Sequence, residues 1–329
     1  MASDPVHCRL DGRLFAAIAI LCGLAAACSP QQSALHPAGE DAEKVAVLFW
    51  AMTGAGAVIW CIVMGFAIYA VVGRNRPRTE RFADRFILIG GVAFPVTTLA
   101  LLLVFGLSLL PAWGETEAPD LRVHVTAEQY WWRLAYELED GGRVETANQL
   151  HLPTGANVEF ILQSNDVIHS FWIPALGGKM DAIPGRTNAL RLTPTKPGTY
   201  RGVCAEFCGP SHALMAFPVE VQDQAGFDAW LAAERQPAAV AGSAAFIAAG
   251  CGACHFVRGV TEAGSVGPDL THLAGRRTIG AGILPNTREN LAAWLVAPEH
   301  FKPGVGMPSY AALPEADRDA IVAYLVALR

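Results

Sequence analysis

The chain has 329 residues and a formal net charge of −6, and 52% of its residues are hydrophobic whereas only 16% are charged. This length allows two or three domains, and so low a charged fraction is unusual for a soluble protein. The negative net charge argues against nucleic-acid binding, which requires a basic surface. Half of the eight cysteines fall in two short metal- or haem-type motifs and the others lie in apolar or N-terminal segments, so no disulfide framework is predicted.

The N-terminal segment, residues 1–28, has the pattern of an export signal. Arg9 and Arg13 precede an apolar run over residues 14–27, which has the length of a signal core and is too short to span a membrane comfortably. The run ends in Leu-Ala-Ala-Ala-Cys, which resembles a bacterial lipoprotein cleavage box and makes Cys28 a candidate for lipidation. Plain signal cleavage and retention as an anchor are the alternatives. Residues 29–44 then form a polar connector.

Two uncharged apolar stretches follow, at residues 45–72 and 86–112. Each exceeds the roughly 20 residues that a membrane-spanning helix needs, and Pro95 in the second is tolerated where neighbouring helices satisfy the freed carbonyl. The alternative is a pair of buried helices in a soluble core, which are seldom so long and free of charge. The short loop between the stretches is rich in arginine, which marks the cytoplasmic side: Arg74, Arg76, Arg78, Arg81 and Arg85. Residues 45–112 should therefore form a hairpin in a bacterial inner membrane, with the rest of the chain on the periplasmic side.

From about residue 120 to residue 222 the periodicity becomes that of β-strands. Apolar and polar residues alternate over 121–125, and short apolar runs occur at 158–162 and 189–192. Glycine- and proline-containing turn signals separate these runs. Several short strands at such spacing predict an all-β sandwich.

A cluster of soft metal donors lies in this segment. Two thiols, an imidazole and a thioether fall within the twelve residues 204–215, and His169 lies upstream. Such donors favour copper, and a mononuclear blue-copper site would need only one of the two cysteines. Two thiolates can bridge two metals, so we predict a dinuclear copper centre. Cys204 and Cys208 would bridge, His169 and His212 would be terminal ligands, and Met215 and the Glu206 backbone carbonyl would be axial. A zinc site or a buried cysteine pair is the alternative, but zinc sites seldom recruit methionine.

The C-terminal part, after a predicted helix and linker at residues 225–242, carries a second cofactor motif. Cys251-Gly-Ala-Cys254-His255 is the attachment sequence of c-type haem, in which both thiols form thioethers and His255 binds the iron. Met307 lies in a Gly/Pro-framed loop 52 residues after His255 and is the expected second axial ligand. A redox Cys-x-x-Cys pair is the alternative, but it would leave His255 without a role.

Taken together, these motifs resemble cytochrome c oxidase subunit II with a fused C-terminal cytochrome c domain, as in caa-type haem-copper oxidases. The family's copper pattern, C-x-E-x-C-x-x-x-H-x-x-M with an upstream histidine, is filled at every position. The resemblance implies a multidomain membrane protein. It would contain a two-helix transmembrane hairpin (45–112), an all-β cupredoxin-like CuA domain (113–224) and an all-α class I cytochrome c domain (243–329).

The resemblance also implies a function, namely electron relay in a terminal oxidase. A cytochrome c or similar donor would reduce the single covalent haem c, electrons would pass to CuA, and subunit I would reduce oxygen and pump protons, with subunit III as a further partner. No catalytic residue is expected in this chain. The alternative is a CuA and haem c subunit of a nitric oxide reductase-type complex. A copper-binding assembly factor is disfavoured, because it would have no use for a covalent haem.

Three further roles come from the resemblance alone. The Glu206 carboxylate would reach a magnesium site shared with subunit I. The aromatic run Tyr130, Trp131 and Trp132 would lie where electrons enter, although the first position is commonly a tryptophan; a buried aromatic core is the alternative. Leu88 stands where many members have a glutamate at the mouth of a proton path, so that role is not transferred to this chain.

Overall fold

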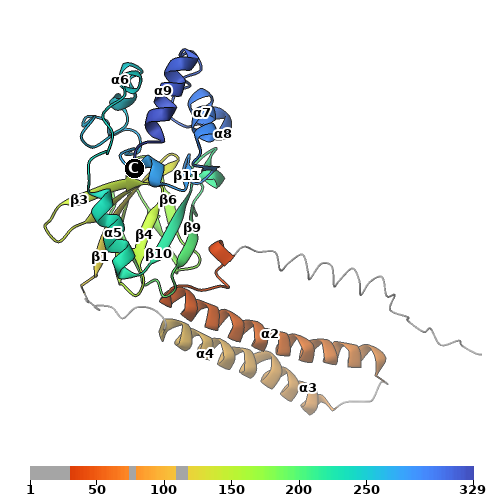
Figure 1. Ribbon diagram of the computed structural model, residues 1–329. Coiled ribbons are helices and arrows are strands. Elements are labelled where there is room, and N and C mark those ends of the chain that lie inside the picture. Colours follow the sequence, from red (N-terminus) through yellow and green to blue (C-terminus); the bar gives the residue numbers. More distant parts are fainter. Residues whose placement is uncertain (1–29, 74–78, 109–117) are drawn as a thin grey trace, which may run out of the picture. The chain divides into compact units, whose positions relative to one another are not determined.

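The computed structural model describes residues 30–73, 79–108 and 118–329, so the predicted export signal and Cys28 lie outside the described residues. The chain divides into two compact units. One is helical and contains the described residues between 43 and 120; the other contains residues 30–42 and 121–329 (Figure 1). Each unit is described by itself.

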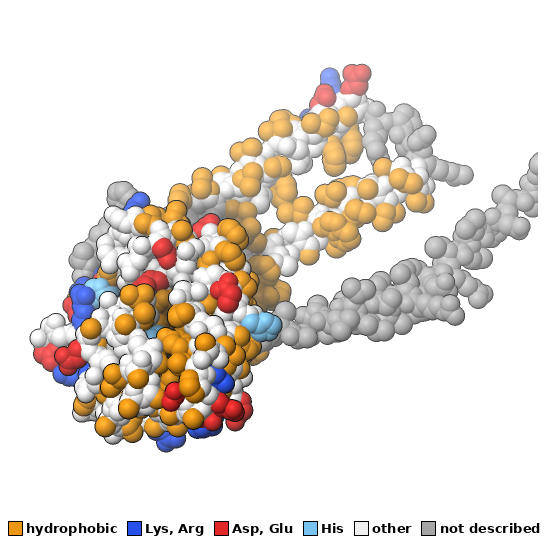
Figure 2. Space-filling view, turned by 90° about the horizontal axis from the view of Figure 1, so that it is seen from above, with side chains coloured by type: hydrophobic (Ala, Val, Ile, Leu, Met, Phe, Trp, Pro, Cys, Tyr) orange, Lys and Arg blue, Asp and Glu red, His pale blue; other side chains and the backbone are white. Residues whose placement is uncertain are grey.

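The helical unit is a pair of long apolar helices. The first is α2 (Glu40–Val72), and the second is continuous through α3 (Glu80–Phe86), the π-helical η2 (Ile87–Ala93) and α4 (Phe94–Ser108). Both are long and apolar enough to cross a membrane. Phe66 and Phe86 meet edge to face with ring centroids 5.5 Å apart, so the two helices are in contact. Hydrophobic side chains cover them in Figure 2, and charged side chains gather at the start of α3.

The helices begin earlier than the apolar stretches that predicted them. Charged residues of the first turn of α2 and of α3 are helical, and Arg81 and Arg85 lie in α3 rather than in a loop. Hydrophobicity marks the part of a helix that needs an apolar environment, whereas backbone hydrogen bonding decides where the helix begins. The π-helical turn directly precedes Pro95, whose missing N–H and bulky ring disrupt regular α-helical bonding.

Residues 121–222 form two five-stranded sheets with an apolar core, which is the predicted all-β domain. The first sheet has the order β3 (Arg143–Ala147), β2 (Trp131–Glu137), β1 (Leu121–Glu128), β5 (Val158–Ser164) and β8 (Asn188–Leu192). The second has the order β4 (Leu150–Pro153), β10 (Ala216–Gln222), β9 (Gly198–Cys204), β6 (His169–Trp172) and β7 (Lys179–Ala182). Alternate residues of β1 are fully buried, as a strand with one face on a core requires. The aromatic side chains Trp132, Phe171 and Phe217 pack edge to face and stacked within the core.

Helix α5 (Gln224–Glu234) follows the last strand and packs against the β-domain. Asp223 caps it, because its carboxylate accepts a hydrogen bond from the Gly226 N–H at 2.8 Å. Trp230 on this helix packs against the Tyr136 ring, with centroids 5.0 Å apart.

The C-terminal domain is mostly helical and has its own core. Phe246 and Tyr324 stack obliquely near its centre, and Leu291, Leu295 and Ile321 are buried around them. The family resemblance predicted an all-α domain; the structure adds one short β-hairpin. Its elements are α6 (Ala244–Ala248), η4 (Cys251–Ala253), η5 (Leu273–Gly275), β11 (Thr278–Ile279), β12 (Leu284–Pro285), α7 (Arg288–Val296), α8 (Pro298–Phe301) and α9 (Glu315–Leu325).

Candidate copper and haem sites

The predicted copper ligands meet at one end of the second sheet. Strand pairing places Phe171 opposite Cys204, which brings His169 at the start of β6 beside the end of β9. The His169 Nδ1 lies 3.7 Å from the Cys204 Sγ, and the His212 Nδ1 lies 3.7 Å from the Cys208 Sγ. The two sulfur atoms are 3.9 Å apart. Met215 brings its Sδ to 4.0 Å from the Cys208 Sγ.

A backbone oxygen completes this arrangement. The Glu206 carbonyl oxygen lies 3.2 Å from the Cys204 Sγ, whereas the Glu206 side chain is exposed. Each sulfur therefore has one imidazole and one weak donor beside it. A single copper bound by one thiolate, both imidazoles and one weak donor would leave the second thiolate and the second weak donor unused, so the donor set fits two metals with both sulfurs shared. The geometry thus fits the predicted dinuclear centre.

The two thiols have opposite pKa shifts because they share a hydrogen bond. The bond between the sulfurs lowers the pKa of Cys204 to about 3, and the same bond raises the pKa of Cys208. Cys204 is therefore the first to become a thiolate, which is the form that binds metal.

Asp166 fixes the orientation of the upstream histidine. Its Oδ1 lies 2.8 Å from the His169 Nε2, and its carboxylate also accepts hydrogen bonds from the backbone N–H groups of Gln129 and Val167. Although burial raises the pKa of Asp166, these hydrogen bonds outweigh that effect and lower it. Because the carboxylate accepts a hydrogen bond from Nε2, the other ring nitrogen, Nδ1, is left facing the sulfurs.

The haem-attachment motif lies beside a carbonyl that orients its histidine. The His255 Nδ1 lies 2.8 Å from the Pro268 carbonyl oxygen, so Nε2 remains for the iron. Burial lowers the pKa of His255, which favours the neutral imidazole that binds metals. Gly267 allows this approach, because a Cβ at that position would lie 2.6 Å from the His255 ring.

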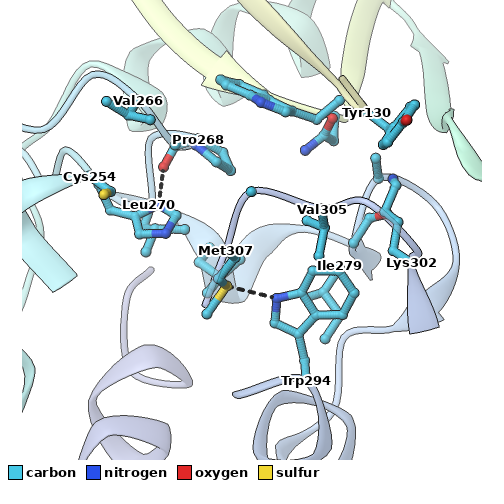
Figure 3. Close-up of a pocket in the computed structure, with 18 of the residues that line it drawn as sticks. Tyr130, Cys254, Val266, Pro268, Leu270, Ile279, Trp294, Lys302, Val305 and Met307 are labelled. Atoms are coloured by element: carbon cyan, nitrogen blue, oxygen red, sulfur yellow. Dashed lines mark hydrogen bonds between the residues drawn. The ribbon is translucent and has the colours of Figure 1, made fainter. Parts of the chain in front are cut away.

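A cavity of about 330 Å³ opens between this motif and the predicted second ligand. Cys251, Cys254, His255 and Met307 line it (Figure 3). The Met307 sulfur accepts a hydrogen bond from the Trp294 Nε1 at 3.2 Å and points into the same space. The volume, the mostly apolar lining and the two soft or imidazole donors fit a haem group.

The aromatic run divides between two environments. Trp132 is fully buried in the β-domain core, where it contacts His169 edge to face, so the core interpretation holds for it. Tyr130 and Trp131 line the haem cavity together with Gln129, whose amide donates to the Cys208 carbonyl at 2.5 Å. One wall of the haem cavity therefore belongs to the copper domain.

Two arginines before β11 have different partners. Arg276 is buried, lines the haem cavity and donates to the Asp269 carbonyl. Arg277 instead forms an ion pair with Glu220 of β10, and its backbone N–H donates to the Gln149 side chain at 2.7 Å. Arg276 is thus placed to face a haem, whereas Arg277 joins the two domains.

Comparison with known proteins gives matches to both domains. Residues 133–222 match the family described as cytochrome C oxidase subunit II, periplasmic domain, and residues 239–329 match the family described as cytochrome c. The protein named cytochrome c oxidase subunit 2 of Bacillus subtilis is 31% identical, over 96% of this chain and 98% of the relative.

Two other proteins with that name match over a shorter length. Those of Alkalihalophilus pseudofirmus and Bacillus sp. PS3 are 42% and 39% identical, each over 63% of this chain. The chain spans only 61% and 62% of these two relatives.

Proposed function

The chain belongs to the cytochrome c oxidase subunit II family, and we propose that it relays electrons into the catalytic subunit of a haem-copper terminal oxidase. A cytochrome c or a similar donor supplies the electrons, which pass through one covalent haem c and then a dinuclear CuA centre to subunit I. There oxygen is reduced and protons are pumped. Subunits I and III are the proposed partners, and the α2–α4 hairpin lies in the bacterial inner membrane with both large domains on the periplasmic side.

The observation that carries this proposal is the wall shared by the two sites. Gln129, Tyr130 and Trp131 line the haem cavity, and the Gln129 side chain is hydrogen-bonded to the backbone of the copper ligand Cys208. Tyr130 is only 4% exposed. A path of bonded and contacting groups therefore leads from the cavity to the sulfur pair without crossing bulk water.

Each ligand has a proposed part in holding the cofactors. Cys204 and Cys208 would hold the two coppers together with the imidazoles of His169 and His212. The Met215 sulfur and the Glu206 carbonyl would be the weak donors. When bound, the copper centre and the haem each accept and release one electron with no bond made or broken in the protein. A buried, strand-anchored frame suits that task, because little needs to move when the charge changes.

We assign the proposed ligands of the haem and of a magnesium ion in the same way. Cys251 and Cys254 would form the thioethers, and the His255 imidazole and the Met307 sulfur would bind the iron. The exposed Glu206 carboxylate is free to reach a magnesium ion at the contact with subunit I.

Electron paramagnetic resonance of the full chain, purified in detergent with copper and haem, tests the proposal. We expect hyperfine splitting from two equivalent copper nuclei and a low-spin ferric haem signal. Cys208→Ser should abolish the two-nucleus pattern, whereas Cys61→Ser, at an exposed position of α2, should retain it. Splitting by a single copper nucleus in the unmodified chain would contradict the dinuclear assignment.

The final acceptor is tested on the complex purified through this chain. Reduced cytochrome c should drive oxygen uptake by that complex. Consumption of nitric oxide without oxygen uptake would instead assign the chain to a reductase.

A further inference from the structure

We propose that Lys302 is a positioning residue that fixes the haem domain on the copper-binding loop, so that electrons cross between two docked domains rather than during occasional encounters. The inference rests on the proposed function and adds a residue outside both ligand sets.

The contacts of Lys302 join the two domains directly. Lys302 follows α8 and is only 2% exposed. Its Nζ donates to the Leu214 carbonyl at 3.1 Å, in the copper loop, and to the Gly280 carbonyl at 2.7 Å, in the haem domain. Lysine is almost never fully buried without partners, because removing its amine from water is costly. The two carbonyls, one from each domain, therefore account for its burial.

Neighbouring contacts connect the same two segments. The Ser211 hydroxyl donates to the Pro303 carbonyl at 2.6 Å, and the Ala216 N–H donates to the Ala281 carbonyl at 3.1 Å. Gly304 lies against Tyr130, since a Cβ there would be 3.4 Å from the tyrosine ring. The loop that carries His212 and Met215 is thus bonded before its ligands to the segment that leads into Met307, and after them to the turn between β11 and β12.

The contacts at the edge of the interface between the domains are more exposed to solvent than those of Lys302. Arg277 pairs with Glu220, and the Arg133 guanidinium donates to the Ser265 carbonyl at 2.5 Å. The Arg277 side chain is 59% exposed, and exposed ion pairs are weak and screened by salt. The Lys302 contacts are shielded from solvent, so docking should persist at high ionic strength.

Hydrogen–deuterium exchange on the full chain in detergent tests the docking. Lys302→Met keeps the length of the side chain but leaves both carbonyls without a donor. The Ala216 amide, which is bonded across the interface, should then exchange about tenfold faster or more. The amides of β1 and β2 should be unchanged. Lys179→Met is the control, because Lys179 is an exposed lysine of β7 whose contacts with Ser170 and Asp181 lie within the β-domain.

Two exchange results would overturn the proposal. Unchanged exchange at Ala216 in Lys302→Met would show that Lys302 does not hold the domains together. Faster exchange only within the haem domain would show that the bond to Gly280 merely stabilises that domain. If Lys302→Met fails to fold, Ser211→Ala removes the neighbouring bond alone, and an unchanged Ala216 amide in that variant would count against a docked interface.

Flash reduction of the haem, in the full chain loaded with copper and haem, tests whether the docked arrangement speeds electron transfer. One electron leaves the ferrous haem, which becomes ferric, and reduces the copper centre; no proton or group moves. In Lys302→Met we expect unchanged haem and copper spectra, transfer slowed by about tenfold or more, and a new dependence on solvent viscosity. Faster Ala216 exchange with unchanged transfer would overturn the positioning role. An unmodified chain without a copper signal would instead refute the proposed function, while the exchange experiment would still judge the docking.

Discussion

Buried titratable residues couple the stability of the β-domain to pH, and His151 is the clearest case. It is 9% exposed, its ring stacks on Trp230 with centroids 4.1 Å apart, and Gln149 lies 2.9 Å from its Nε2. Burial lowers the pKa of His151 to about 4, from 6.5 in the unfolded chain. Above pH 6.5 neither state is protonated. Between pH 6.5 and 4 the unfolded chain takes up the proton first, so the free energy of unfolding falls as the pH falls.

This linkage should cost about 3 kcal/mol by pH 4, since each pKa unit corresponds to about 1.4 kcal/mol. Chemical denaturation of the full chain, followed by tryptophan fluorescence at several pH values, measures it. His151→Gln should be less stable at neutral pH yet lose less stability on acidification. His36→Gln, at an exposed histidine, should follow the unmodified chain. Parallel pH curves for His151→Gln and the unmodified chain would refute the assignment.

Also at the residue scale, the amino-acid types identified the metal ligands but not the residues that hold those ligands in place. The spacing of Cys204, Cys208, His212 and Met215 was enough to predict a copper site, because ligand chemistry is carried by the residues themselves. The sequence left open whether Asp166 forms a turn or accepts a hydrogen bond near His169, and the burial of Lys302 was not predictable. An aspartate in a turn and a lysine after a helix have ordinary local roles, and only the tertiary fold supplies their partners.

At the scale of elements, the ligand-bearing strand β9 depends on one glycine. Gly202 pairs with Phe217 of β10, and a Cβ at Gly202 would lie 2.0 Å from the Phe217 ring. Phe217 is fully buried and stacks on Phe171, so it has no free space to move into. Gly202→Ala should therefore destabilise the β-domain by about 1–3 kcal/mol, the usual cost of overpacking a core.

Phe171 and Trp132 transmit that displacement toward His169, so the copper spectrum of Gly202→Ala should also broaden. Thermal unfolding and paramagnetic resonance of the copper-loaded chain measure the two effects. Gly178→Ala is the control, because a Cβ at Gly178 meets nothing within 4 Å. Equal melting temperatures for the two variants would contradict the packing argument.

Elements were predictable where their pattern was local, and less so where their partners were distant. The alternation in β1 and the two long apolar stretches predicted a strand and two helices. The aromatic run 130–132 was ambiguous, because a period of two cannot say what covers each face. Trp132 lies in the core, whereas the haem domain covers Tyr130. That covering comes from residues about 170 positions later in the chain.

At the scale of the whole molecule, electrons pass through the two cofactor sites in series. A mutation at the copper site should therefore slow electron transfer after the haem but not reduction of the haem itself. His212→Asn removes the imidazole beside Cys208 and leaves the haem motif untouched. Stopped-flow mixing of the oxidase complex with reduced cytochrome c measures both steps. We expect the haem to be reduced at the normal rate. Loss of a residue that only supports a metal ligand typically lowers metal affinity or activity by about 10–100-fold, so loss of a ligand should slow electron transfer beyond the haem by more than about a hundredfold.

His300→Asn, at an exposed position of the haem domain, is the control and should leave both steps unchanged. Normal arrival of electrons in subunit I with His212→Asn would mean that they bypass the copper loop, and the series arrangement would have to be abandoned.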